Sequence, residues 1–211
     1  MDPRELREQA IKDAKCGVIL DAARKIFIEK GYWNARMDDI AVASGFSKPS
    51  LYNYYPDKES IFLSIAIREN RDLFNKITNE VSVEGQCIQA LERLFRILLE
   101  NMKKHFSMMG SMNQIQNLAS MRIDMNKHND LVNEFKKLIE LIIDSIRKIV
   151  ENGKNAGEIA SDLDSTTLAL YIGSLIQGAQ YDWRRKGKTG DIDSEILQML
   201  TFVKNGASIH L

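Results

Sequence analysis

The chain has 211 residues, of which 44% are hydrophobic and 27% are charged, and its 29 basic and 29 acidic side chains give a formal net charge of zero. A chain of this length and composition can bury a substantial core, and it lies outside the disordered and collagen-like classes. Basic and acidic side chains are equally numerous in the first 70 residues, so composition alone gives no indication of nucleic-acid binding.

Cysteine content and hydropathy indicate a protein of the reducing cytoplasm. Cys16 and Cys87 are far apart and lack the spacing of a disulfide framework or a zinc site. The first 15 residues alternate in charge and do not form a signal peptide. The longest stretches without Asp, Glu, Lys or Arg, residues 105–121 and 165–181, fall short of the roughly 20 apolar residues of a membrane span. We expect no membrane partner, no cofactor and no metal.

Apolar residues recur at helical spacing along the chain, which predicts an all-α fold. The only prolines are Pro3, Pro49 and Pro56, so the strongest helix breaker is absent after residue 56. A first helix is indicated by Ile19, Ala22, Ala23, Ile26 and Phe27, and it stops at Gly31. A second helix of about two turns begins near Met37 and ends at Gly45.

A third helix is expected from Lys48 to about Tyr55, with Ser47 as its cap and Pro49 in its first turn. Pro56 closes this helix, and Asp57 is placed to cap a long fourth helix that ends near Gly85.

The rest of the chain has the pattern of a helical bundle. Its predicted helices cover residues 87–99, a short methionine-rich stretch at 108–117, residues 131–149, and, after a turn at 152–159, residues 165–186 and 192–205.

Two short helices joined by a glycine-containing turn fit a helix-turn-helix, whose second helix enters the DNA major groove. Leu51 is expected to face inward with Phe46 and Tyr55. The side chains left on the outward side are Lys48, Ser50, Tyr52, Asn53 and Tyr54. Asparagine can pair with adenine, and tyrosine, serine and lysine can bind bases or phosphates. Lys58 begins the fourth helix, where free amides favour a phosphate. That the two tyrosines only pack against neighbouring helices stays open.

Residues 19–65 resemble the N-terminal DNA-binding domain of the TetR family of bacterial transcriptional regulators. The matching landmarks, in chain order, are Ala22-Ala23 with Phe27, Lys30-Gly31-Tyr32, Asp39-Ile40-Ala41, Ser44 to Ser47, Leu51 to Tyr55, and Asp57 to Ser60. The resemblance implies a helix-turn-helix domain at residues 1–62, with an N-terminal arm at 1–15, and a helical ligand-binding and dimerisation domain at 63–211.

The resemblance also implies residue roles in binding a double-stranded DNA operator. Ser50, Tyr52, Asn53 and Tyr54 would lie in the groove or on its backbone, and Lys48 and Lys58 would contact phosphates. Ala35-Arg36 stands where the family usually has a threonine pair, so a hydroxyl contact is lost and Arg36 is expected to replace it with a charged one.

One short helix contacts too few base pairs to find a single site, so a homodimer is expected. The candidate interface on the last two helices consists of Leu168, Tyr171, Ile172, Leu175, Ile176, Ala179, Trp183, Ile196, Leu200 and Val203. The alternative is that these faces pack only within one chain.

The uncharged, methionine-rich stretch at 105–121 is a candidate lining for a pocket that takes an apolar or amphipathic effector. The candidate ligand-binding residues are Phe95, His105, Met109, Met112, Asn113, Gln116 and Phe135. A plain core helix would explain the same residues.

The function expected from these features is a homodimeric repressor that a small molecule releases from its operator. Activation or corepression stays open. The three histidines, His105, His128 and His210, lack the spacing of a catalytic metal site, so an enzyme is not expected. A helical protein-interaction adaptor without DNA readout is the remaining alternative.

Overall fold

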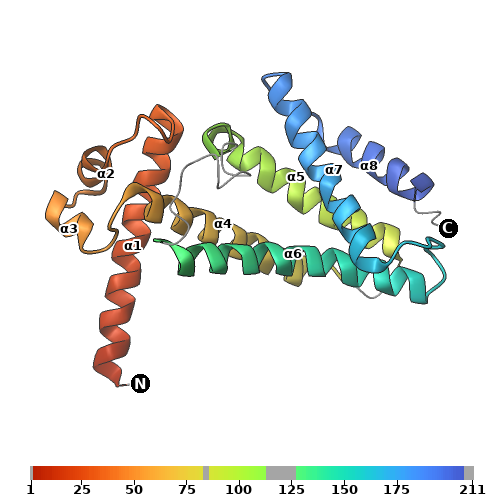
Figure 1. Ribbon diagram of the computed structural model, residues 1–211, viewed down its shortest axis with the longest axis horizontal. Coiled ribbons are helices and arrows are strands. Elements are labelled where there is room, and N and C mark those ends of the chain that lie inside the picture. The colour runs from red at the N-terminus through yellow and green to blue at the C-terminus, as the bar shows by residue number, and fades with distance from the viewer. Residues whose placement is uncertain (1, 83–85, 113–126, 207–211) are drawn as a thin grey trace. The chain divides into compact units, whose positions relative to one another are not determined.

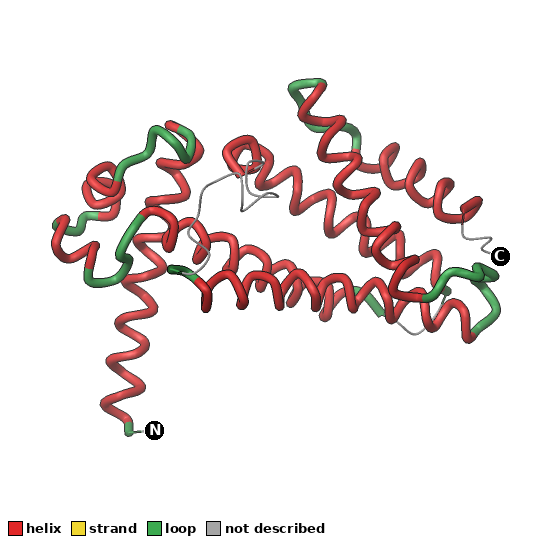
Figure 2. Tube along the Cα trace, viewed as in Figure 1, coloured by secondary structure: helices red, strands yellow, loops and turns green. Residues whose placement is uncertain are grey.

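The computed structural model describes residues 2–82, 86–112 and 127–206, without the side chains of residues 106–112. Every helix or strand assigned in these ranges is an α-helix, which confirms the all-α prediction (Figure 2). The helices are α1 (Pro3–Lys30), α2 (Met37–Ser44), α3 (Lys48–Tyr52), α4 (Lys58–Glu80), α5 (Cys87–Met112), α6 (Asn129–Asn155), α7 (Ser165–Arg185) and α8 (Ile192–Gly206) (Figure 1). Within the described ranges, no helix is both long enough and apolar enough to cross a membrane.

The chain forms two compact units. The first contains residues 1–68 and 107–135, and the second contains residues 69–106 and 136–211. Helices α4, α5 and α6 each contribute residues to both units. The single boundary expected after residue 62 stays a prediction.

Helix α1 is longer than its apolar pattern indicated. The segment expected as an N-terminal arm is helical from Pro3 onward. Asp2 caps this helix, because its carboxylate accepts the amide of Arg4 at 3.1 Å while Glu5 accepts the amide of Asp2 at 3.1 Å. The buried positions of α1 begin at Ile19, and half-buried Cys16, one turn earlier, also packs against the core.

The first unit is built around a buried aromatic cluster. The ring centroids of Phe27, Tyr32 and Phe62 lie 5.0 to 5.7 Å apart, and all three side chains are buried. Leu51 from α3 and Val132 from the start of α6 belong to the same core. The predicted second helix is confirmed, since α2 ends at Ser44 and Gly45 follows it in the left-handed conformation with φ of 74°.

Helix α3 ends at Tyr52, three residues earlier than predicted. The amides of Tyr54 and Tyr55 both donate to the carbonyl oxygen of Leu51 at 3.0 Å, so the chain turns before it reaches Pro56. The predicted caps are confirmed. Ser47 Oγ accepts the amide of Ser50 at 3.3 Å, and an Asp57 oxygen accepts the amide of Ser60 at 2.8 Å.

In the second unit, α4 ends at Glu80, before the predicted end near Gly85. Helix α5 continues without a break to Met112, so the start of the methionine-rich stretch belongs to α5; residues 113–117 lie outside the described part of the chain. Helices α7 and α8 match their predicted extents to within one residue and lie side by side (Figure 1). The indole nitrogen of buried Trp183 donates to Glu195 at 3.2 Å and links them.

Candidate functional site

The aromatic rings of the turn and short helix at residues 45–55 differ in their exposure to solvent. Leu51 and Tyr55 are buried, as predicted. Phe46 and Tyr54 are half-buried and pack against the core, with their ring centroids 5.8 Å apart. Tyr54 is therefore less available to DNA than its expected outward position implied.

The remaining outward positions of α3 are exposed. Lys48 and Asn53 are exposed, Tyr52 is 43% exposed, and Ser50 is half-buried. Lys48, Ser50 and Tyr52 lie on α3, and Asn53 lies in the turn that follows it. Leu51, between Ser50 and Tyr52, is completely buried and anchors this segment to the core. A hydroxyl, an amide, a phenol and an ammonium are thus held in fixed relation on one short segment.

Four of the predicted DNA-binding residues meet at one shallow depression. Arg36, Lys48, Tyr52 and Lys58 all line a depression of about 420 Å³ in the first unit. Its lining also contains acidic side chains, and Lys48 forms an ion pair with one of them, Asp38, at 2.7 Å. This hydrogen bond, reinforced by the charge of the carboxylate, raises the pKa of Lys48. Ser50, Asn53 and Tyr54 are not part of the lining.

The ammonium of Lys58 is hydrogen-bonded to backbone carbonyls within the fold, so it is less available to a DNA phosphate than the sequence predicted. Its ammonium nitrogen donates to the carbonyl oxygens of Tyr32 at 2.9 Å, Ala35 at 3.1 Å and Trp33 at 3.4 Å. Burial lowers the pKa of Lys58, and Glu59 opposes that effect. The ammonium therefore satisfies the carbonyls of the connection between α1 and α2, a role that the sequence reasoning missed.

The start of α2 is held by an aspartate rather than by a hydroxyl. Arg36 occupies the cap position and makes no side-chain cap, whereas Asp39 accepts the amide of Arg36 at 3.1 Å. Asp39 also pairs with Lys30 at 2.7 Å. The hydrogen bond from Lys30, with that from the Arg36 amide, lowers the pKa of Asp39. The side chain of Arg36 is exposed.

The beginning of α4 is linked to the beginning of α6 within the first unit. Asp57 lies 2.5 Å from the ammonium nitrogen of Lys127 and 3.4 Å from Nε2 of buried His128. Burial would raise the pKa of Asp57, but Lys127, the Ser60 amide and the charge of His128 hold it below its ordinary value. Sequence spacing could not reveal this link, because the partners are about 70 positions apart.

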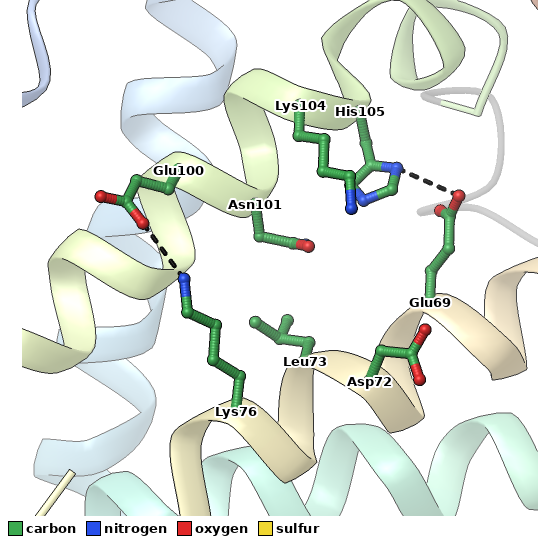
Figure 3. Close-up of a pocket in the computed structure, with 8 residues that line it drawn as sticks. All are labelled: Glu69, Asp72, Leu73, Lys76, Glu100, Asn101, Lys104 and His105. Atoms are coloured by element: carbon green, nitrogen blue, oxygen red, sulfur yellow. Dashed lines mark hydrogen bonds and ion pairs between the residues drawn. The ribbon is translucent and has the colours of Figure 1, made fainter. Parts of the chain in front are cut away.

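In the second unit, α4 and α5 form a polar pocket of about 280 Å³, which we call the α4–α5 pocket (Figure 3). Its lining residues are Glu69, Asp72, Leu73, Lys76, Glu100, Asn101, Lys104 and His105. A single face of α4, at positions i, i+3, i+4 and i+7, supplies half of them. Of the predicted effector residues, only His105 lines this pocket.

The other predicted effector residues belong to different units or have side chains outside the described part of the chain. Phe95 is completely buried in the second unit, and half-buried Phe135 belongs to the first. Met109 and Met112 lie on α5, but their side chains, and all of Asn113 and Gln116, lie outside the described part of the chain. The pocket predicted for the methionine-rich stretch stays a prediction. No group of three or more histidine, cysteine or acidic side chains suited to a metal occurs among the described residues.

The predicted dimer residues fall into two sets. Six are buried within the chain itself: Leu168, Ile172, Ala179, Trp183, Ile196 and Val203. The other four are half-buried or exposed: Tyr171, Leu175, Ile176 and Leu200. Further exposed apolar side chains lie on the same two helices, namely Leu170, Tyr181, Leu197 and Phe202, each at least 50% exposed. The sequence pattern identified the helices but not which of their faces stays open.

Comparison with known proteins agrees with this geometry. Residues 19–65, which contain α2 and α3, match the family model described as bacterial regulatory proteins, tetR family. The chain is 26% identical over 212 residues to the HTH-type transcriptional repressor KstR2 of Rhodococcus jostii, with 100% of both chains covered. It is 22% identical over 187 residues to the fatty acid metabolism regulator protein of Bacillus subtilis, covering 86% of this chain and 91% of that protein.

The fold also has counterparts among solved structures. The transcriptional regulator FadR from Bacillus subtilis, solved in complex with stearoyl-CoA, aligns with a TM-score of 0.74 at 18% identity, covering 92% of this chain and 98% of that one. At this identity the likeness concerns the fold alone.

Proposed function

Because the chain belongs to the TetR family of bacterial regulatory proteins and is a transcriptional regulator rather than an enzyme, we propose a more specific role. It is a homodimeric repressor that binds a DNA operator through its first unit and leaves that operator when a small molecule binds.

The main support for this proposal is that polar side chains of α3 and of the turn after it are exposed, while Leu51 anchors the segment in the core. Tyr52 and Asn53 are exposed directly after the buried Leu51. Asn53 reads a base edge, preferably adenine, while Tyr52 and Lys48 bind phosphate oxygens. Arg36, at the start of α2, binds the backbone of the flanking strand.

Recognition of a whole operator, with two half-sites, requires a second copy of the chain. A recognition helix of five residues contacts few base pairs, and two copies spaced by one DNA turn, roughly 34 to 36 Å, supply the missing contacts. The exposed apolar side chains of α7 and α8 support this pairing. Leu197 and Phe202 are 67% and 65% exposed, and large apolar side chains gathered on one surface are typical of protein interfaces.

The proposed effector is an apolar or amphipathic small molecule. Two similar proteins support this choice. One is a fatty acid metabolism regulator, and the other is a transcriptional regulator solved in complex with stearoyl-CoA. A ligand that prefers the conformer unable to bind the operator weakens DNA binding by its differential affinity for the two conformers, and by no more. Helix α4 is the proposed carrier of this change, since it contributes to both units.

Fluorescence anisotropy with the full-length protein tests the proposal. Labelled duplexes that tile the DNA beside its own gene are titrated across a salt series. Tight binding to one tile, with affinity that falls steeply as salt rises, supports an operator-binding dimer. Equal, weak binding to all tiles and to a genome-wide pool of fragments contradicts it and favours a protein-interaction adaptor.

A further inference from the structure

One histidine–carboxylate contact and one ion pair divide the facing surfaces of α4 and α5 into a bounded site. Nδ1 of His105 lies 3.0 Å from a Glu69 oxygen at one end, and Lys76 lies 3.2 Å from Glu100 at the other. Figure 3 shows the two pairs on opposite sides of the α4–α5 pocket. The side chains of the first pair are 9% and 13% exposed, and those of the second are 41% and 47% exposed. The site is thus closed at the histidine end and open at the lysine end.

The polar groups between these pairs have complementary charges. Asp72 comes from α4, whereas Asn101 and Lys104 come from α5. Among the residues that the structure describes, neither Asp72 nor Lys104 has an ion-pair partner within 4.0 Å. Figure 3 shows Leu73 projecting toward the space between the helices. The pocket therefore offers one carboxylate, one ammonium and one amide around a short apolar wall.

We infer that the α4–α5 pocket binds a small zwitterion, a molecule with one ammonium and one carboxylate joined by a short aliphatic chain. The ligand ammonium binds Asp72, the ligand carboxylate binds Lys104 and the amide of Asn101, and the aliphatic chain packs on Leu73. A molecule with a single charge would leave Asp72 or Lys104 without a partner in the pocket.

The size of the pocket limits the ligand. About 280 Å³ corresponds to roughly nine water molecules at about 30 Å³ each, which is room for about eight to ten non-hydrogen atoms. Among the unbranched ω-amino acids, 5-aminopentanoate and 6-aminohexanoate fall in this range, whereas 3-aminopropanoate and 4-aminobutanoate are smaller. The site is chemically distinct from the apolar pocket proposed around the methionine-rich stretch, although His105 was a candidate for that pocket too.

Isothermal titration calorimetry and thermal unfolding of the full-length protein test this inference. The probes are the four ω-amino acids from 3-aminopropanoate to 6-aminohexanoate, with pentanoate and pentylamine as ligands of single charge. The expected result is that at least one ω-amino acid binds and raises Tm, while pentanoate and pentylamine bind at least tenfold more weakly.

Two variants and two matched controls locate the site. Asp72→Asn and Lys104→Met are expected to weaken binding by roughly 10- to 100-fold, the loss that follows from removing a hydrogen bond to a charged group. Lys103→Met and Glu140→Gln change exposed side chains outside the lining and are expected to leave binding unchanged. The inference is overturned if no ω-amino acid binds, if the singly charged ligands bind equally well, or if both pocket variants retain full affinity.

The regulatory consequence of this site rests on the proposed function, and it is measured separately. Operator anisotropy is recorded with and without the bound ω-amino acid. Failure to bind any operator contradicts the proposed function and leaves the calorimetric result standing. Absence of calorimetric binding overturns the zwitterion site and leaves operator binding untouched.

Discussion

Lys58 holds Tyr32 in two ways, because its ammonium nitrogen lies 2.9 Å from the Tyr32 carbonyl oxygen and 4.5 Å from the centroid of the Tyr32 ring. The Tyr32 hydroxyl in turn donates to Glu59 at 3.2 Å. Burial of this hydroxyl, together with the charge of Glu59, raises the pKa of Tyr32. The connection from α1 to α2 is therefore fastened to the start of α4.

Lys58→Met tests whether this lysine stabilises the folded state or binds a DNA phosphate. Loss of its charge-assisted hydrogen bonds is expected to lower the free energy of unfolding by about 1 to 3 kcal/mol, measured by urea denaturation. The salt dependence of operator affinity is expected to stay unchanged. Lys48→Met is the matched control, and it is expected to reduce the slope of log K against log salt by about 0.9. A reduced slope for Lys58→Met would assign it to a phosphate instead.

The link from Asp57 to Lys127 and His128 should make the stability of the first unit depend on pH in the acid range. Asp57→Asn keeps a side chain that can cap α4 but removes the charge, and it is expected to cost about 1 kcal/mol near neutral pH. The pKa of Asp57 is lowered in the folded state. Its stabilisation is therefore present above the unfolded-state pKa of about 3.9 and is lost as pH falls through the lower folded-state value. Urea denaturation of both proteins at a series of pH values should show the two curves converging only in that acid range.

Two glycines should respond to alanine in opposite directions. Gly45 has φ of 74° after α2, so Gly45→Ala is expected to cost about 1 to 2 kcal/mol of folding free energy. Gly17 lies inside α1, and a methyl group added to its Cα would meet no atom within 4 Å outside its own helical backbone. Gly17→Ala is therefore expected to stabilise the protein by up to about 1 kcal/mol. Thermal unfolding measures both, and equal effects of the same sign would contradict the assigned turn.

The open faces of α7 and α8 should control the oligomeric state. Leu197→Asp with Phe202→Asp is expected to convert a dimer to a folded monomer, detected by sedimentation velocity with circular dichroism as the check on folding. Val42→Asp, at an exposed apolar position on α2, is the control. Trp183→Ala is expected to act differently, lowering stability by about 3 to 5 kcal/mol, since that side chain is buried within the chain. An unchanged dimer in the double variant would place the interface elsewhere.

The sequence predicted well the features that depend on neighbouring residues. The end of α2 at Gly45, the caps at Ser47 and Asp57, and the helical class follow from local backbone and hydrogen-bonding preferences. It predicted less well where tertiary contacts decide. The early end of α3, the fastening of Lys58 and the half-burial of Tyr54 depend on groups brought together only by folding.

The candidate sites divide in the same way. Exposure of Tyr52 and Asn53 follows from helical spacing around Leu51, which one segment of sequence is enough to show. The α4–α5 pocket joins residues about 30 positions apart, so its pairing of acidic and basic groups is visible only in three dimensions.

Operator affinity of Asn53→Ala against that of Asn155→Ala tests most directly the claim that α3 reads DNA. Both asparagines are exposed, and only Asn53 lies at the recognition segment. Fluorescence anisotropy on the operator duplex and on an unrelated duplex gives the specificity ratio for each protein. The expected result is that Asn53→Ala loses about 1 to 3 kcal/mol of discrimination while Asn155→Ala matches the unaltered protein. Equal specificity ratios for all three proteins would contradict base recognition by Asn53.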